Sequence, residues 1–139
     1  MVILFDGVCN LCNWWLRFIL KHDKNSVFKF ASLQSKYGTE LLAHYNLPST
    51  PLESVLLYDG KELYSHSDAI IRISSKLSSI YKVWIALKFL PRFIRDLLYR
   101  IIAKSRYSIF GKRKECMVPD ETMKSRFLDD TPFIPGQPV

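Results

Sequence analysis

Two cysteines near the start of the chain, Cys9 and Cys12, are the residues best suited to chemistry. They stand three positions apart, where a strand-like run gives way to helical spacing, so both can lie on one side of the first helical turn. Unpaired backbone N–H groups and the positive end of the helix dipole stabilise a thiolate at such a place. The spacing therefore predicts a redox pair in which Cys9 attacks a disulfide and Cys12, the less exposed thiol, resolves the mixed disulfide.

The residues around the pair refine this prediction. Asn10 and Leu11 bring no proline, histidine or charge between the cysteines, which favours a moderately reducing pair over a strong oxidant. Asp6 precedes Cys9 by three residues, where a carboxylate opposes thiolate formation but could also shuttle the thiol proton. A turn-forming role is the alternative for Asp6. The candidate catalytic residues are Cys9, Cys12 and Asp6, and we expect no cofactor.

Two other roles for the cysteine pair stay open at this point. The thiols could be small buried hydrophobic side chains, or they could be half of a zinc site. Zinc needs four ligands, and the remaining candidates are scattered along the chain without a second close pair: Cys116, His22, His44 and His66. We therefore expect no metal. Three cysteines also cannot build a disulfide framework.

The elements that must position the pair follow from hydrophobic periodicity and turn signals. Strands are expected at residues 2–5, 27–33, 54–58 and 62–64, and helices at residues 11–19, 34–45 and 69–76. Asp59-Gly60 is a hairpin turn signal between the last two strands. Ser67 and Asp68 are predicted to cap the helix that begins at Ala69.

The order β-α-β-α-β-β-α predicts an α/β fold with helices on both faces of a sheet, which is the thioredoxin-like order. We expect this core over residues 1–79. Residues 80–118 are predicted to add helices broken at Pro91, with an apolar face that includes Leu97 and Ile101. Residues 119–139 form a proline-containing tail that is expected to wrap the surface or to be partly disordered. The tryptophans and phenylalanines, Trp14 among them, are interpreted as core.

The charge and hydropathy of the chain indicate which classes of molecule it could bind. The chain of 139 residues carries a net charge of +7, and the excess of Lys and Arg is concentrated between Lys82 and Arg126. No recognition motif accompanies it, so we expect no specific nucleic acid. The basic residues are interpreted first as a solvated face of the protein, and contact with an anionic membrane surface or an acidic partner is the alternative for these helices. No secretion signal or bilayer-spanning run is recognised, which predicts a cytoplasmic protein; the oligomeric state stays open.

The motif Asp6-Gly7-Val8-Cys9-Asn10-Leu11-Cys12 resembles the Asp-Gly-x-Cys-x-x-Cys signature of the DCC family of thiol-disulfide oxidoreductases. Ser67-Asp68-Ala69 and the run from Arg106 to Lys112, followed by Cys116, resemble other segments typical of that family. The resemblance implies a thioredoxin-like fold and thiol-disulfide exchange with a protein or low-molecular-weight thiol or disulfide. The roles of Arg106, Tyr107 and Cys116 stay open.

One departure from working thioredoxins bears on the function. Those proteins place a cis-proline just before the third strand, whereas Leu52-Glu53-Ser54 occupies that place here and Pro51 comes too early. Either substrate docking differs, or the pair acts as a non-catalytic redox sensor. A haloacid-dehalogenase-type phosphatase would also begin with an apolar strand and an Asp such as Asp6. It needs a second Asp two residues on, where this chain has Val8.

Overall fold

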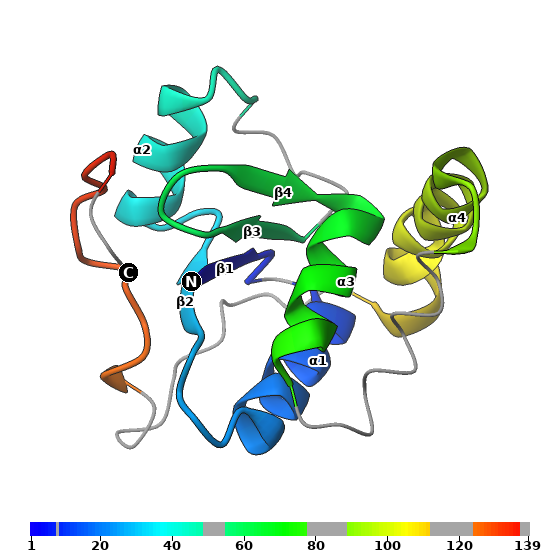
Figure 1. Cartoon of the computed structure of the whole chain (residues 1–139), viewed down its shortest axis with the longest axis horizontal. Helices are drawn as coiled ribbons and strands as arrows, with labels where there is room; N and C mark the ends of the chain where they lie inside the picture. The colour runs from blue at the N-terminus through cyan, green and yellow to red at the C-terminus, as the bar shows by residue number, and fades with distance from the viewer. Residues whose placement is uncertain (8, 49–54, 78–88, 112–123, 137–139) are drawn as a thin grey trace.

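The computed structural model describes residues 1–7, 9–48, 55–77, 89–111 and 124–136 (Figure 1). Four strands form one sheet in the order β2-β1-β3-β4: β1 (Val2–Phe5), β2 (Lys29–Ser32), β3 (Leu56–Tyr58) and β4 (Leu63–Ser65). β1 pairs in parallel with β2 and antiparallel with β3, and β3 pairs antiparallel with β4. The sheet is therefore mixed, with β1 at its centre.

Helices cover both faces of this sheet. α1 (Asn10–His22) and α3 (His66–Lys76) lie on one face, and α2 (Lys36–His44) lies on the other (Figure 1). Because side chains alternate along a strand, Ile3 and Phe5 of β1 pack towards α1 and α3, whereas Val2 and Leu4 pack towards α2. Burial on both sides explains why every residue of β1 is apolar. The predicted order of strands and helices is confirmed, and the fold is α/β and thioredoxin-like.

The start of α3 differs from the prediction. The helix begins at His66 with Ser65 as its N-cap, and the Ser65 side chain makes no capping hydrogen bond. Ser67 and Asp68 lie inside the first turn and bind a neighbouring helix, so the prediction that they cap a helix at Ala69 is wrong. Their preference for capping positions is overridden by tertiary contacts.

α4 (Arg92–Phe110) follows Pro91 and is the described part of the predicted appended segment. Polar side chains hold this helix against α3. Ser67 Oγ donates to Asp96 Oδ1 at 2.7 Å, and Asp68 forms ion pairs with Arg92 at 3.0 Å and Arg95 at 3.3 Å. The Val55 N–H also donates to the Tyr99 hydroxyl at 2.9 Å. The helix is therefore held through its polar side.

The described part of the tail lies along β2 and adds to the fold. The Phe30 N–H donates to the Arg126 carbonyl and the Leu128 N–H donates to the Phe30 carbonyl, both at 2.8 Å, as in a parallel bridge. Phe127 packs against the core cluster on the α1 face. The tail is thus a partner of the sheet's outer strand as well as a surface segment.

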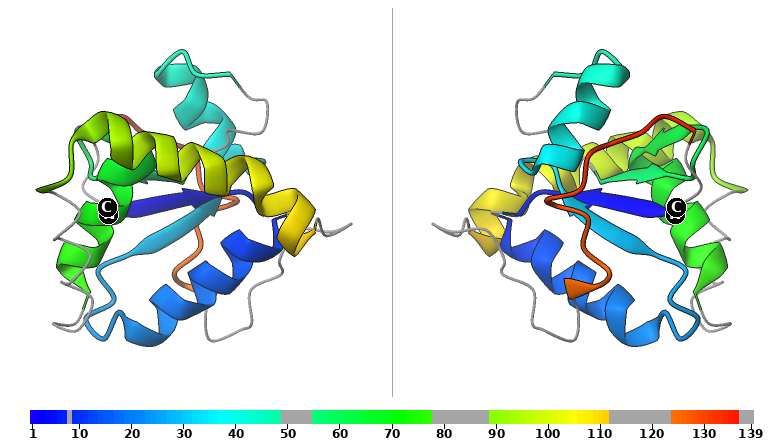
Figure 2. Two further views of the ribbon diagram at one scale, coloured as in Figure 1. Left: turned by 90° about the vertical axis from the view of Figure 1, so that its right-hand side faces the viewer. Right: turned by 90° about the vertical axis from the view of Figure 1, so that its left-hand side faces the viewer.

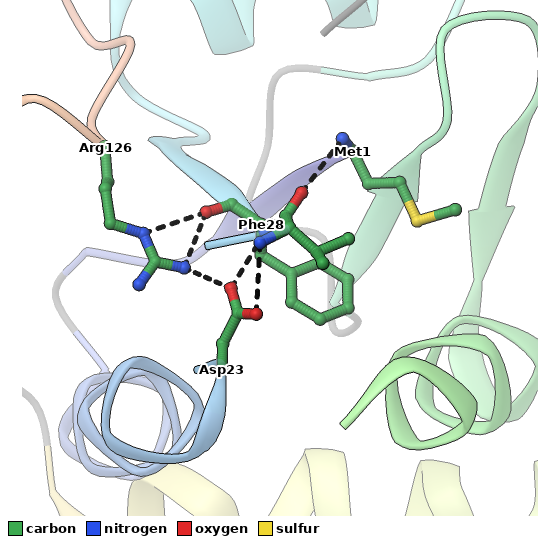
Figure 3. Close-up of polar contacts among 5 residues, drawn as sticks. Met1, Asp23, Phe28 and Arg126 are labelled. Carbon is green, nitrogen blue, oxygen red and sulfur yellow. Dashed lines mark hydrogen bonds and ion pairs between the residues drawn. The ribbon is translucent and has the colours of Figure 1, made fainter. Parts of the chain in front are cut away.

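One buried ion pair fastens the tail to the core. Figure 3 shows the Arg126 guanidinium between the Asp23 carboxylate and the Phe28 carbonyl. The Asp23 side chain is 1% exposed and also accepts the N–H groups of Val27 at 3.0 Å and Phe28 at 2.9 Å. These bonds give the carboxylate several donors, which a buried charge needs.

None of the described helices is long and apolar enough to cross a bilayer.

Candidate active site

The cysteine motif lies where the chain leaves the central strand. β1 ends at Phe5, and after the turn at Asp6 and Gly7 the helix α1 begins at Asn10, so Cys9 is its N-cap residue. Cys9 has φ −89° and ψ 120°, and its N–H donates to the Asp6 carbonyl at 3.2 Å. This short strand-to-helix connection is the local structure that the sequence predicted.

The Cys9 side chain caps the helix. Its Sγ accepts the Cys12 N–H at 3.4 Å, in the way that a serine or aspartate oxygen accepts at other helix N-caps. A thiolate accepts such a bond better than a thiol and also gains from the helix dipole. α1 has no acidic residue in its first turn. The capping N–H and the helix dipole therefore favour negative charge on Cys9, whereas its burial and the neighbouring Asp6 carboxylate oppose it.

The burial of the two cysteines is the reverse of the prediction. Cys9 is completely buried, whereas Cys12 is 6% exposed. The physical reason is the extended backbone of Cys9, which turns Sγ back over the first turn and into the core cluster with Phe5 and Leu16. No disulfide joins Cys9 and Cys12 in this structure.

Asp6 lies buried beside the motif. Its carboxylate Oδ1 accepts the side-chain amide of Gln34 at 3.0 Å, and Gln34 Oε1 in turn accepts the Gly7 N–H at 3.3 Å and the Ser32 hydroxyl at 2.5 Å. Gln34 therefore links the end of β2 to the turn that carries the cysteines. Gln34 was not among the residues predicted for the site. The signal was available, because the carboxyl ends of parallel strands meet at one edge of a sheet and Gln34 follows β2.

Asn13 is a second polar residue that the sequence analysis missed. It is 4% exposed and donates from Nδ2 to the Gly7 carbonyl at 3.1 Å. Its Oδ1 is a buried acceptor without a hydrogen-bond partner among the described residues. Helical spacing could have identified Asn13, because it stands four residues after Cys9 and three before Leu16, on the inward side of α1.

The aromatic residues of α1 divide between core and surface. Trp15 packs against the core, but Trp14 is 63% exposed, so its assignment to the core is wrong. The inward positions are taken by Cys12, Leu16 and Ile19, and Trp14 points away from them. It stacks on Phe18 with ring centroids 5.9 Å apart. An exposed aromatic surface therefore lies two residues from Cys12.

The C-terminal end of α4 lies beside the motif. Figure 2 shows the end of α4 next to the start of α1, and the two helices are in contact. A Cβ on Gly111 would be 3.5 Å from Asn10 Nδ2. The side chains of Arg106 and Tyr107 lie outside the described part of the chain, as do Cys116 and the segment with Pro51 and Leu52–Ser54. The described residues contain no cis peptide bond.

The arrangement joins two thiols, a capping N–H and a buried carboxylate within one turn of chain. No group of three or more His, Cys, Asp or Glu suited to a metal ion occurs in the parts of the chain that the structure describes. Two thiols of this spacing at a helix N-terminus can exchange with a disulfide and close a disulfide between themselves.

Comparison with known proteins gives a family match. The sequence model of the DCC1-like thiol-disulfide oxidoreductase family matches residues 3–112. "Uncharacterized protein YuxK" of Bacillus subtilis (strain 168) is 40% identical over 127 residues, which cover 91% of this chain and 93% of that protein. "DCC family protein At1g52590, chloroplastic" of Arabidopsis thaliana is 36% identical over 116 residues, covering 83% and 67%. No solved structure matches.

Proposed function

Because the chain belongs to the DCC1-like thiol-disulfide oxidoreductase family, we propose that it catalyses thiol-disulfide exchange with Cys9 as nucleophile and Cys12 as resolving thiol. The observation that carries this assignment is the N-cap geometry, in which Cys9 Sγ accepts the Cys12 N–H. Of the two thiols, Cys9 is the one at the helix terminus, where a negative charge is stabilised.

The reaction proceeds in two exchanges. The Cys9 thiolate attacks one sulfur of a substrate disulfide, the substrate S–S bond breaks, and the other substrate sulfur leaves as a thiolate that takes up a proton. Cys12 then loses its proton and attacks Cys9 Sγ, which releases the second substrate thiol and leaves a Cys9–Cys12 disulfide. Two electrons and two protons pass from the pair to the substrate. A low-molecular-weight thiol such as glutathione reverses these steps and restores the pair.

Asp6 is the proposed proton acceptor. It is 2% exposed, its backbone carbonyl holds the Cys9 N–H, and Gln34 fixes its carboxylate. A carboxylate in such a place can accept the proton that a thiol loses when it attacks, and return it to the leaving sulfur. The amide of Gln34 positions Asp6 and does not itself take part in the exchange.

Replacement of Asp6 by asparagine is expected to slow the exchange about a hundredfold at neutral pH, because the amide cannot accept the proton. Stopped-flow reduction of an oxidised peptide by the reduced protein measures the rate. Asp130→Asn, at an exposed position on the tail, is the control and keeps the wild-type rate. A faster exchange in Asp6→Asn would mean that Asp6 acts by repelling the thiolate, and it would contradict the proton-acceptor role.

A redox titration tests the proposed function directly. The protein is equilibrated with glutathione buffers of graded potential, and free thiols are trapped and counted at each step. We expect a reversible two-electron transition between roughly −270 and −180 mV, absent in Cys9→Ser and retained in Cys116→Ser. A missing transition would contradict a redox function. A transition without catalysed reduction of any peptide disulfide would instead identify a redox sensor.

A further inference from the structure

The outer side of α4 is an exposed apolar surface. Large hydrophobic side chains occupy two neighbouring rows along it, and each is at least half exposed: Phe93, Leu97 and Ile101 in one row, and Leu98, Ile102 and Ile109 in the other. Spacings of four residues, and of seven between Ile102 and Ile109, place the members of each row on one side of the helix. We call these six residues the outer face of α4. Phe89, just before the helix, is 92% exposed.

This arrangement inverts the usual amphipathic helix. A surface helix normally turns its apolar stripe to the core and its polar side to water. α4 instead docks through Asp96 and Arg95, which bind α3, and through Tyr99, which binds the backbone of Val55 just before β3. In Figure 1, α4 lies at one edge of the molecule, next to α3. The polar side is already occupied by the fold, and the outer face is the part that lacks a partner in the described structure.

The charges on α4 indicate what the outer face contacts. Arg100 and Lys104 are exposed and stand one turn apart beside the row of Phe93, Leu97 and Ile101. The single acid of α4, Asp96, is turned inward, where it accepts the Ser67 hydroxyl and lies near Arg92. The whole chain carries a net charge of +7. The exposed side of α4 is therefore apolar and cationic, without a carboxylate.

We propose that the outer face of α4 binds the surface of an anionic lipid bilayer, with the helix lying flat in the headgroup region. An apolar face bordered by Arg and Lys is the combination that such helices use, since the apolar side chains enter the acyl boundary while the cations contact lipid phosphates. This surface binding differs from spanning, for which α4 is unsuited.

A second copy of the chain fits the outer face less well. Two copies packed face to face would bring Arg100 and Lys104 of each chain towards the same pair of the other, and α4 supplies no outward acid to compensate them. Like charges that are brought together at an interface cost free energy. Lipid phosphates compensate the cations directly.

Vesicle flotation with the full-length protein tests the proposal. We expect the protein to float with vesicles of phosphatidylcholine and phosphatidylglycerol, and to bind vesicles of phosphatidylcholine alone at least about tenfold more weakly. Binding should fall as salt is raised, because the lipid charges are screened. Equal binding to both vesicles, or none to the anionic ones, would overturn the proposal.

Two pairs of variants assign the binding to α4. Leu97→Ser with Ile101→Ser should weaken binding at least about tenfold, whereas Ile134→Ser, which removes an apolar side chain of similar exposure from the tail, should not. Arg100→Glu with Lys104→Glu should abolish binding to anionic vesicles. Lys24→Glu with Lys61→Glu makes the same change in net charge at exposed sites off α4 and should retain most of it.

Misfolding of a variant and self-association of the chain are measured separately from vesicle binding. Far-UV circular dichroism must show that each variant is folded, and Cys9→Ser must bind vesicles like the wild type, since the outer face does not depend on the thiols. Sedimentation equilibrium reports self-association. A stable dimer that the Leu97→Ser and Ile101→Ser variant dissociates, together with loss of vesicle binding in the dimer, would show that a second copy covers the face and would overturn the proposal.

Discussion

Replacement of Cys9 by serine is expected to reduce the rate of disulfide reduction to that of the uncatalysed reaction, a loss of at least about a thousandfold. The reason is chemical: the serine hydroxyl has no accessible anion at neutral pH that could attack a disulfide sulfur. The helix N-cap is retained, because the serine oxygen can accept the Cys12 N–H that Cys9 Sγ accepts. Loss of activity in this variant is therefore separable from loss of fold.

The matched variant Cys12→Ser distinguishes the two roles. It keeps the nucleophile and lacks the resolving thiol, so we expect a mixed disulfide between Cys9 and a peptide substrate to accumulate to about one equivalent. Intact-protein mass spectrometry with and without reductant measures this adduct. If Cys9→Ser accumulates the adduct and Cys12→Ser does not, the roles of the two cysteines are reversed. This comparison is needed because Cys12 is slightly more exposed than Cys9.

Replacement of Arg126 by alanine is expected to cost about 3 kcal/mol of the free energy of unfolding, because it leaves the buried Asp23 carboxylate without its cationic partner. The Arg126 side chain is 17% exposed and also donates to the Phe28 carbonyl at 2.8 Å. Urea denaturation measures the loss, which corresponds to a fall in Tm of about 10 °C. Arg17→Ala, an exposed arginine on α1, is the control and should cost no more than about 0.5 kcal/mol.

A double-mutant cycle isolates the charge interaction. Asp23→Asn removes the buried charge, so the double variant with Arg126→Ala should be more stable than the sum of the single losses predicts. The difference should exceed about 1 kcal/mol, the upper value typical of exposed ion pairs. Additive losses would show that Arg126 acts through packing on Phe30, over whose ring its guanidinium lies, and would contradict the charge argument.

The part of the fold nearest the cysteines was predictable because local signals and global topology agree there. The apolar strand β1, the turn at Asp6-Gly7 and the helical spacing after Cys9 each point to the same strand-turn-helix unit, and consistency of this kind makes a pattern reliable. The hairpin between β3 and β4 was also predicted correctly, from the turn signal Asp59-Gly60. The family resemblance, carried by the spacing of Asp6, Cys9 and Cys12, was confirmed for the same reason.

The features that were not predicted from the sequence depend on contacts between distant segments. Gln34 reaches Asp6 across two parallel strands, and Arg126 reaches Asp23 from a tail whose composition indicates surface. The burial of Cys9 depends on one backbone torsion at the N-cap, which spacing does not encode. The orientation of α4 was also hidden, because periodicity locates an apolar face and says nothing about which way it points.

The pairing of the tail with β2 protects the protein against aggregation through the edge of its sheet. β2 is an outer strand, and an outer strand with open N–H and C=O groups is a template on which another chain can add and aggregate. Here the Phe30 N–H and C=O are both taken by the tail's backbone. A proteolytic cut that releases residues 124–136 would expose this edge next to an apolar surface, so tail cleavage would lead to precipitation even where the remaining core stays folded.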